Sequence, residues 1–388
     1  MSSTDDGHNS YFPFGNSFRQ IFSRKSHMSP KFLALLNDFE LMLARSLTSL
    51  EPKDSSEIFS LSWMRQALES LSVIHTNIKG LITDLQFPLS DWDNSWMNVY
   101  LDDSIKLLDI CIALSSELSR FDQGQLLLQY VLHILDPSIN FPSSEQLKRA
   151  AESHHELMWR FKSRNPKLEH CHEILQKLAE KLYIGKVRNN SSKGKVLMRA
   201  LYGVKVETIF VCSIIIAVLS GSSKPLIELN VPEKFFWSKA FNELQVTILP
   251  EVRAHLSSEK PKVSLLKELE AVEISADRLH NLICKKQEKL LCQCNVVDSE
   301  DFASMEKSAE NGNREGEVIL SQKLSEQEER KRLQESVSDL AEKAEKLFEG
   351  VDILSSRVDD FFQILLNGRD ALLANLRVLD QPEERASL

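Results

Sequence analysis

The residues best suited to metal chemistry are histidines and a cysteine in the run His170-Cys171-His172, together with His154 and His155 upstream. Imidazole and thiolate groups are ligands that zinc prefers. On a helix, however, side chains two residues apart point to different sides and do not readily share one ion. The run is therefore a weak candidate for a metal site.

The remaining cysteines give no stronger signal. Cys292 and Cys294 are separated by one residue, whereas zinc knuckles separate their cysteines by two to four. Cys284 lies too far along the chain to complete a recognised spacing. The chain has 6 cysteines, most of them in apolar stretches, where a free thiol behaves as a small hydrophobic side chain. We expect no metal, no cofactor and a reducing compartment.

Two aspartate pairs, Asp102-Asp103 and Asp359-Asp360, suggest the magnesium-binding DDxxD helix of all-helical isoprenoid enzymes. The fifth position of that motif is acidic, but here it is Lys106 in one case and Gln363 in the other. We therefore expect ordinary solvated helix faces. The nucleotide-binding and hydrolase patterns G-x-G-x-x-G, G-x-x-x-x-G-K-[ST] and G-x-S-x-G do not occur, so the sequence predicts no enzymatic activity.

Composition favours helices as the elements that position these residues. The 388 residues include only 12 Gly and 12 Pro, too few for the turns of β-sandwiches and barrels. At about 150 residues per domain, the length suits two or three units or one continuous helical body. The formal charge of -9 has the wrong sign for a general nucleic-acid binder. We predict an all-α fold, an elongated multi-helix bundle, with no nucleic-acid partner.

Apolar spacing and chain breakers divide the sequence further. Ser29 and Pro30 form a helix start, and Ser143 with Gln146 has capping-box spacing. Asp91 begins another predicted helix, and a separate short helix is predicted after it, over 125–135. The predicted segments are an N-terminal aromatic arm at 1–28, a helical bundle at 29–185, a basic connector at 186–195, apolar central helices at 196–295, an acidic flexible linker at 296–316, a long coiled-coil-like helix at 317–380 and a tail at 381–388.

The predicted C-terminal helix has the clearest periodicity in the chain. Its apolar residues alternate steps of four and three, which is a heptad pattern and favours left-handed packing against a partner helix. That partner lies either in the same chain or in a second copy, and the oligomeric state stays open. The residues are Leu333, Val337, Leu340, Ala344, Leu347, Val351, Leu354, Val358, Phe361 and Leu365.

One charge-free run is a membrane candidate, from Thr208 to Leu219. As a helix it would span roughly 18 Å, short of the ~30 Å hydrocarbon core, so spanning would place Glu207 or Lys205 in lipid. We expect a buried core helix. The alternative is shallow insertion, with the basic connector facing anionic headgroups. The candidate residues are Ile209, Phe210, Val211, Ile214, Ile215, Ile216, Val218 and Leu219.

The N-terminal segment 11–19 (YFPFGNSFR) is aromatic but has no helical or strand period, so it is predicted to be an extended arm that contacts a partner or the protein's own surface. Asp5 and Asp6, with no apolar run after them, count against a signal peptide and a plastid transit peptide. We expect a cytoplasmic protein, with peripheral membrane contact, a single membrane pass or a plastid location as alternatives. The candidate interaction residues are Tyr11, Phe12, Phe14, Phe18 and Arg19.

Several long strings resemble the plant BYPASS family, and the resemblance covers nearly the whole chain except residues 296–330. The strings are 11–19 (YFPFGNSFR), 62–65 (SWMR), 91–93 (DWD) with Trp96, 99–102 (VYLD), 106–120 (KLLDICIALSSELSR), 193–208 (KGKVLMRALYGVKVET), 368–373 (GRDALL) and 375–377 (NLR).

The resemblance implies a non-enzymatic regulator of root and shoot development that restrains a root-derived, carotenoid-related mobile signal. Similar plant proteins include exocyst interactors, which implies protein partners and offers a trafficking adaptor as an alternative. A second alternative is an enzyme or carrier for an apolar metabolite, with a pocket lined by residues 208–219 and by Phe235, Phe236 and Trp237. The family provides no catalytic residues to carry over.

Overall fold

The computed structural model describes residues 29–85, 94–135, 142–182, 192–257, 264–297 and 312–379. Within these ranges all regular structure is helical, which confirms the predicted all-α class. The elements are α2 (Pro30–Ser49), the short 3-10 helix η1 (Ser55–Phe59), α3 (Leu61–Asp84), α4 (Asn94–Ile134), α5 (Ser144–Lys162), α6 (Pro166–Glu180), α7 (Ser192–Ser220), α8 (Ser238–Leu256), α9 (Lys267–Val297) and α10 (Gly312–Leu379).

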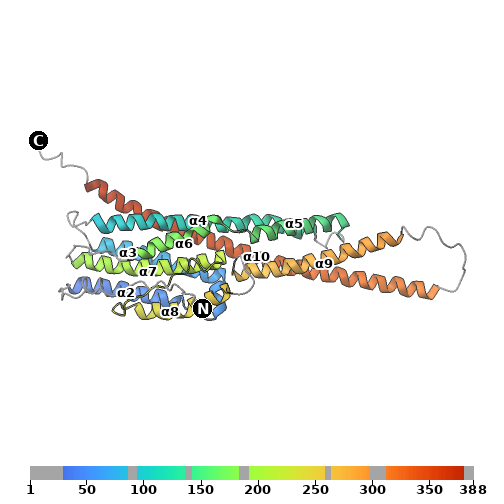
Figure 1. Cartoon of the computed structure of the whole chain (residues 1–388), viewed down its shortest axis with the longest axis horizontal. Helices are drawn as coiled ribbons and strands as arrows, with labels where there is room; N and C mark the ends of the chain where they lie inside the picture. The colour runs from blue at the N-terminus through green and yellow to red at the C-terminus, as the bar shows by residue number, and fades with distance from the viewer. Residues whose placement is uncertain are drawn as a thin grey trace, which may run out of the picture.

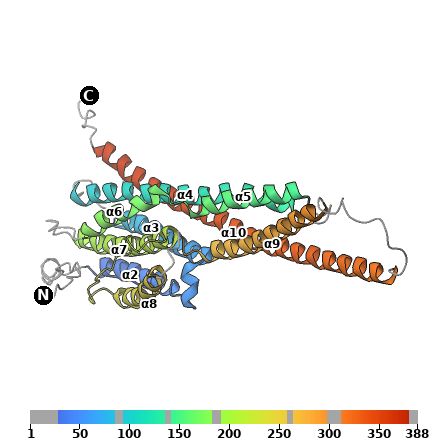
Figure 2. The same cartoon turned by 45° about the vertical axis from the view of Figure 1, so that its right-hand side comes forward.

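The helices lie roughly along one long axis, and together they form the elongated bundle that the sequence predicts (Figures 1 and 2). Helix α7 is central to the wider half and contacts α2, α3, α4, α6 and α8. Helix α10 runs along much of the molecule and packs on α3, α4 and α9. The ends of α9 and α10 extend beyond the other helices as a projecting pair (Figure 1).

The predicted helix starts occur at the expected residues. The Ser29 side chain accepts a hydrogen bond from the Phe32 backbone N–H at 3.4 Å, with proline in the first turn of α2. Ser143 and Gln146 form a reciprocal capping box at the start of α5. These contacts satisfy backbone donors that have no partner inside the helix, and such caps contribute about 1 kcal/mol each.

Helix α7 forms the centre of the core. The eight candidate residues between Ile209 and Leu219 are each 0–1% exposed. Helix α7 is long and apolar enough to cross a membrane, yet 94% of its most apolar stretch is buried among other helices. In this structure α7 therefore has the position expected for a core helix, and its apolar side chains are covered by protein.

The ten apolar residues of the predicted heptad pattern in α10 are all buried, with exposures of 0–9%. The helices that cover α10 are α3, α4 and α9 of the same chain. The partner helices for this pattern thus lie within the monomer, and no apolar seam is left along residues 333–365 for a second copy.

Several predicted boundaries differ from the observed helix ends. Residues 192–195 of the predicted basic connector form the first turn of α7, where Gly194 is buried, and residues 296–297 and 312–316 of the predicted linker belong to α9 and α10. Composition marks where polar residues accumulate, but a helix continues through them as long as its backbone hydrogen bonds continue. The remaining connector and linker residues, the arm at 1–28 and the tail at 381–388 lie outside the described residues.

The predicted break before residues 125–135 is wrong, because α4 is continuous from Asn94 to Ile134. Gly124, which directly precedes the predicted short helix, is buried inside α4 against α5. A Cβ atom there would lie 2.5 Å from Cε1 of Phe161 and 3.3 Å from Cδ1 of Leu157. The glycine therefore permits close packing of two helices and does not end one.

Replacing Gly124 with alanine is expected to lower the free energy of unfolding by about 1–3 kcal/mol, because the buried Phe161 ring has to move. Gly80, in the exposed face of α3, is the matched control, since its Cβ would meet nothing within 4 Å. Gly80→Ala is expected to stabilise the protein by up to about 1 kcal/mol through helix propensity. Urea unfolding of both variants measures the difference, and equal effects would contradict the packing role.

Candidate functional site

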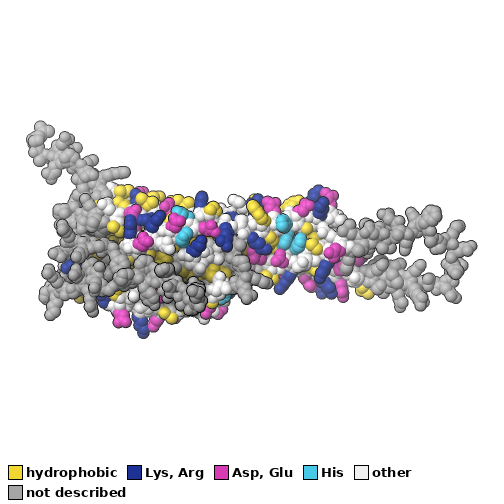
Figure 3. All heavy atoms as spheres, viewed as in Figure 1, with side chains coloured by type: hydrophobic (Ala, Val, Ile, Leu, Met, Phe, Trp, Pro, Cys, Tyr) yellow, Lys and Arg dark blue, Asp and Glu magenta, His cyan; other side chains and the backbone are white. Residues whose placement is uncertain are grey.

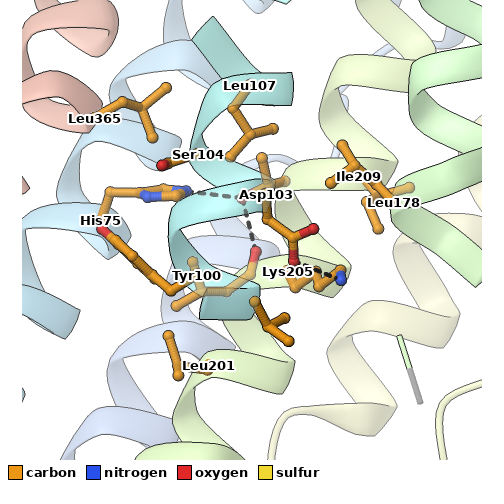
Figure 4. Close-up of a pocket in the computed structure, with 13 residues that line it drawn as sticks. His75, Tyr100, Asp103, Ser104, Leu107, Leu178, Leu201, Lys205, Ile209 and Leu365 are labelled. Carbon is orange, nitrogen blue, oxygen red and sulfur yellow. Dashed lines mark hydrogen bonds and ion pairs between the residues drawn. The ribbon is translucent and has the colours of Figure 1, made fainter. Parts of the chain in front are cut away.

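A half-open pocket lies between α3, α4, α6, α7 and α10 (Figure 4). Its inner space is about 60 Å³, and the total with its open mouth is about 600 Å³. A volume of roughly 15 Å³ suffices for one water molecule, whereas enclosed ligand sites usually exceed about 300 Å³. The apolar lining residues are Val99, Leu107, Leu178, Leu201, Val204, Ile209 and Leu365, and the polar ones are His75, Tyr100, Asp103, Ser104, Lys205 and Thr208.

Helical spacing explains how two helices supply most of this lining. On α4 the lining residues are Val99, Tyr100, Asp103, Ser104 and Leu107. On α7 they are Leu201, Val204, Lys205, Thr208 and Ile209. Residues at these intervals share one face of an α-helix. The pocket is therefore formed where a mixed polar and apolar face of α4 meets a similar face of α7.

The pocket's histidine comes from α3 and forms a buried hydrogen-bond chain. The Nε2 atom of His75 lies 3.0 Å from Thr208 Oγ1, and the Thr208 hydroxyl donates to the Val204 carbonyl at 2.7 Å. Burial lowers the pKa of His75 from 6.5 to about 4, because an imidazolium would lose its hydration there. The ring is therefore neutral at pH 7.

A network of ion pairs flanks the pocket. Lys205 Nζ lies 2.7 Å from Asp103 Oδ2 and 3.0 Å from the Lys181 carbonyl oxygen. Asp102 pairs with Lys106 at 2.6 Å and with Lys181 at 2.7 Å. Hydrogen bonds from these two lysines lower the pKa of Asp102 to about 2, whereas burial lowers the pKa of Lys205 against the opposing effect of Asp103.

The expectation of a solvated face at the first aspartate pair is therefore wrong for Asp103, which is only 9% exposed. Asp103 is buried because Lys205 compensates its charge across the helix interface. Sequence spacing did not show this pairing, since the two residues are 102 positions apart. The available signal was Lys205 itself, a charged residue close to the uncharged run that begins at Thr208.

A second buried carboxyl lies next to Thr208 on α7. Glu207 is fully buried, and its Oε1 atom accepts hydrogen bonds from Ser70 at 2.6 Å and Ser46 at 3.1 Å. Burial raises the pKa of Glu207 from 4.5 to about 7, although the two serine hydrogen bonds act in the opposite direction. This carboxyl links α7 to α2 and α3 in the bundle centre.

Two of the three aromatic residues predicted to line a metabolite pocket, Phe235 and Trp237, lie in the core, and none of the three lines the pocket of Figure 4. Phe235 stacks on Tyr202 with ring centroids 5.0 Å apart, and Trp237 lies 5.4 Å from Phe235. Phe236 is 65% exposed. Phe235 and Trp237 fix the start of α8 against α7. The positions of the three aromatic residues therefore do not support the predicted pocket lining.

The other sequence candidates are not brought together. Cys171 is buried, whereas His170 is exposed and His172 is half-buried. Across the described parts of the chain, His, Cys, Asp and Glu side chains form no group of three or more that could hold a metal ion. Tyr11, Phe12, Phe14, Phe18 and Arg19 all fall outside the described residues.

Comparison with known proteins agrees with the resemblance. A family model described as "Protein ROH1-like" matches residues 14–167. Two proteins described as "UPF0496 protein 4", from Oryza sativa subsp. japonica and subsp. indica, are 42% and 43% identical to this chain over the full length of both sequences. "Protein BPS1, chloroplastic" from Arabidopsis thaliana is 41% identical and covers 97% of this chain and 93% of its own length.

No solved structure matches the chain significantly. The relatives are plant proteins, and the similarity runs from one end of the chain to the other, through every helix of the bundle. Identity of this extent is shared by members of one family. The chain therefore belongs to the plant BYPASS family of developmental regulators.

Proposed function

We propose that this chain is a non-enzymatic regulator of root and shoot development, which restrains production of a root-derived mobile growth-arrest signal by contacting other proteins. The observation that carries the proposal is the similarity to "Protein BPS1, chloroplastic" over 97% of the chain. A match of this length includes the whole helical bundle, so the two proteins share an architecture and not only one motif.

The outer surface of the bundle supports a contact function. Trp159 and Phe236 are 67% and 65% exposed, and exposed aromatic side chains are frequent anchors in protein interfaces. On the face shown in Figure 3, acidic and basic side chains are interspersed, with hydrophobic side chains between them. Such a surface suits protein partners of mixed charge better than a uniformly charged polymer.

Grafting tests the proposed role in the plant. A wild-type shoot grafted onto a root that lacks this protein is expected to arrest, because the root then releases the growth-arrest signal. The reciprocal graft, with a wild-type root below a mutant shoot, is expected to develop leaves normally. Normal growth in both grafts would contradict a root-derived signal.

Affinity purification of the full chain from roots tests the contact mechanism. We expect a reproducible set of partner proteins, and the variants Trp159→Ala and Phe236→Ala are expected to lose members of that set while unfolding like wild type. Recovery of exocyst subunits would select the trafficking-adaptor alternative. Failure to recover any reproducible partner would contradict the contact mechanism.

The cellular location is part of the proposal. We propose a cytoplasmic protein with peripheral membrane contact, and the name of the Arabidopsis relative favours the plastid alternative. A fluorescent fusion of the full chain distinguishes these locations. Carbonate washing of membranes tests a spanning role for α7, which extraction of the protein into the soluble fraction would contradict.

A further inference from the structure

The pocket between α3, α4 and α7 contains a histidine whose tautomer follows from its neighbours. The hydroxyl of Thr208 has one hydrogen, which it donates to the Val204 carbonyl at 2.7 Å. At the 3.0 Å contact with His75 Nε2 the hydroxyl can therefore only accept, so Nε2 carries the ring proton. The Nδ1 atom of the neutral ring is left as a hydrogen-bond acceptor.

Two buried acceptors in the pocket lining have no hydrogen-bond donor within the described part of the chain. One is His75 Nδ1, and the other is Asp103 Oδ1. The second oxygen of Asp103 is bound to Lys205 at 2.7 Å, but Oδ1 lies 3.6 Å from Lys106 Nζ, beyond hydrogen-bond distance. Buried acceptors in folded proteins are nearly always paired, either with protein or with ordered water, so these two atoms mark a place where a donating ligand or a water molecule would bind.

Tyr100 supplies a third polar group at the same place (Figure 4). Its hydroxyl lies over Gly368 of α10, where an added Cβ would approach it to 3.0 Å. Among the described residues this hydroxyl has no hydrogen-bond partner, and it can donate or accept. Because Gly368 has no side chain, the Tyr100 hydroxyl has room to lie at the pocket wall.

The charges around the pocket select among ligand classes. An ionised carboxylate or phosphate has no hydrogen to donate, so it would leave both acceptors, His75 Nδ1 and Asp103 Oδ1, without a hydrogen bond. An ammonium group would lie near Lys205, Lys106 and Lys181, which outnumber the neighbouring Asp102 and Asp103. A neutral hydroxyl donates one hydrogen bond and carries no charge, so it satisfies a buried acceptor without either conflict.

Apart from Ser104, the rest of the lining is apolar. Leu107, Leu178, Val204, Ile209 and Leu365 are buried side chains from four different helices. The inner 60 Å³ is sufficient for a hydroxyl and a few carbon atoms, and the open mouth leaves room for a longer body. A ligand for this pocket therefore has a hydroxyl at its inner end and an apolar remainder.

We propose that the pocket between α3, α4 and α7 binds the hydroxyl-bearing end of a small apolar molecule, with His75 Nδ1 accepting its hydrogen bond. Such binding would make the bundle responsive to an alcohol, which goes beyond the proposed protein-contact function. Helices α3, α4, α7 and α10 meet at this place, so a bound molecule would contact most of the central bundle.

Methyl NMR on the full chain tests the proposal with four probes that share one ring: cyclohexanol, methylcyclohexane, cyclohexanecarboxylate and cyclohexylammonium. Cyclohexanol is expected to shift the methyl signals of Leu107, Ile209 and Leu365 saturably, in the millimolar range. The other three probes are expected to bind about tenfold more weakly or not at all. Equal binding of methylcyclohexane, or preference for either charged probe, would overturn the assignment of a hydroxyl.

Two variants and one direct measurement sharpen this test. His75→Phe is expected to weaken cyclohexanol binding about tenfold, whereas His133→Phe, at an exposed position of α4, should leave it unchanged. Leu201→Phe narrows the pocket and is expected to abolish binding. In the wild-type protein, cyclohexanol should shift the ¹⁵N signal of His75 Nδ1 and not that of Nε2, a readout that needs no variant.

One outcome of this NMR measurement would contradict the proposal. If none of the four probes produces a saturable shift in the wild-type protein, the pocket holds water only and the proposal is wrong. Loss of cyclohexanol binding in His75→Phe counts as support only when the methyl spectrum of the variant shows a folded protein. The proposed protein-contact function is tested separately by grafting and purification, so the two proposals can fail independently.

Discussion

Replacing Arg199 with methionine is expected to lower the free energy of unfolding by about 3–5 kcal/mol at pH 7. The Arg199 guanidinium on α7 binds both carboxylate oxygens of Glu40 on α2, with Nη2 at 3.1 Å from Oε2. Glu40 is only 2% exposed, so removal of the arginine leaves a buried charge without its partner. Methionine retains the length of the side chain, which limits the loss of packing.

The same carboxylate also holds the start of α8. Glu40 Oε2 accepts a hydrogen bond from the Phe236 backbone N–H at 3.0 Å, and Arg199 lies over the Phe235 ring at 5.2 Å. One ion pair thus joins α2, α7 and the segment before α8. Its loss is expected to loosen three elements together, which is why the predicted effect exceeds that of a surface pair.

The neutral double variant separates charge burial from packing. Glu40→Gln combined with Arg199→Met is expected to recover part of the loss, because no buried charge remains. Arg149→Met is the matched control, since Arg149 pairs with Glu145 on the exposed surface of α5 and such pairs contribute less than about 1 kcal/mol. Chemical denaturation measures the free energy of unfolding of Arg199→Met, the double variant and the control. If Arg199→Met lowers this free energy no more than Arg149→Met does, a structural role for the buried ion pair is contradicted.

The fold class could be predicted because its signals are local. Helix starts at Ser29 and Ser143 depend on residues three positions away, and the burial of α10 follows from a repeat within one segment. Such patterns are visible in one sequence without knowledge of neighbouring helices. The continuity of α4 was not visible, since the role of Gly124 depends on Phe161 of another helix.

The pocket could not be predicted for the same physical reason. His75, Asp103 and Thr208 are far apart in sequence and meet only when α3, α4 and α7 pack together. Each residue alone has an ordinary interpretation, and the aspartate pair was expected to face solvent. Lys205 and Glu207, which directly precede the uncharged run of the most apolar helix, were the local sign that polar groups lie in the core.

Glu207 makes the stability of the protein depend on pH in a direction that can be stated in advance. Its pKa in the folded state is about 7, above the value of 4.5 for the unfolded chain. Between these two values the folded state binds more protons than the unfolded state, so the free energy of unfolding falls as pH rises. Above pH 7 the carboxylate is ionised in both states, and the folded protein retains the cost of burying it.

Removing this charge is therefore expected to stabilise the protein at alkaline pH. Relative to wild type, the free energy of unfolding of Glu207→Gln should increase by about 2–3 kcal/mol from pH 5 to pH 8. The glutamine carbonyl can still accept the hydrogen bonds of Ser46 and Ser70. The depressed pKa of His75 weakens both proteins alike as pH falls from 6.5 towards 4, so it cancels in the difference.

Two further variants determine whether the effect belongs to this carboxyl. Glu243→Gln replaces an exposed carboxyl on α8 and is expected to show no change with pH beyond about 0.5 kcal/mol. Ser70→Ala removes a hydrogen bond that lowers the pKa of Glu207, and it should move the pH-dependent loss of stability to higher pH. Parallel stability curves for wild type and Glu207→Gln from pH 5 to pH 8 would show that the buried carboxyl does not titrate in this range.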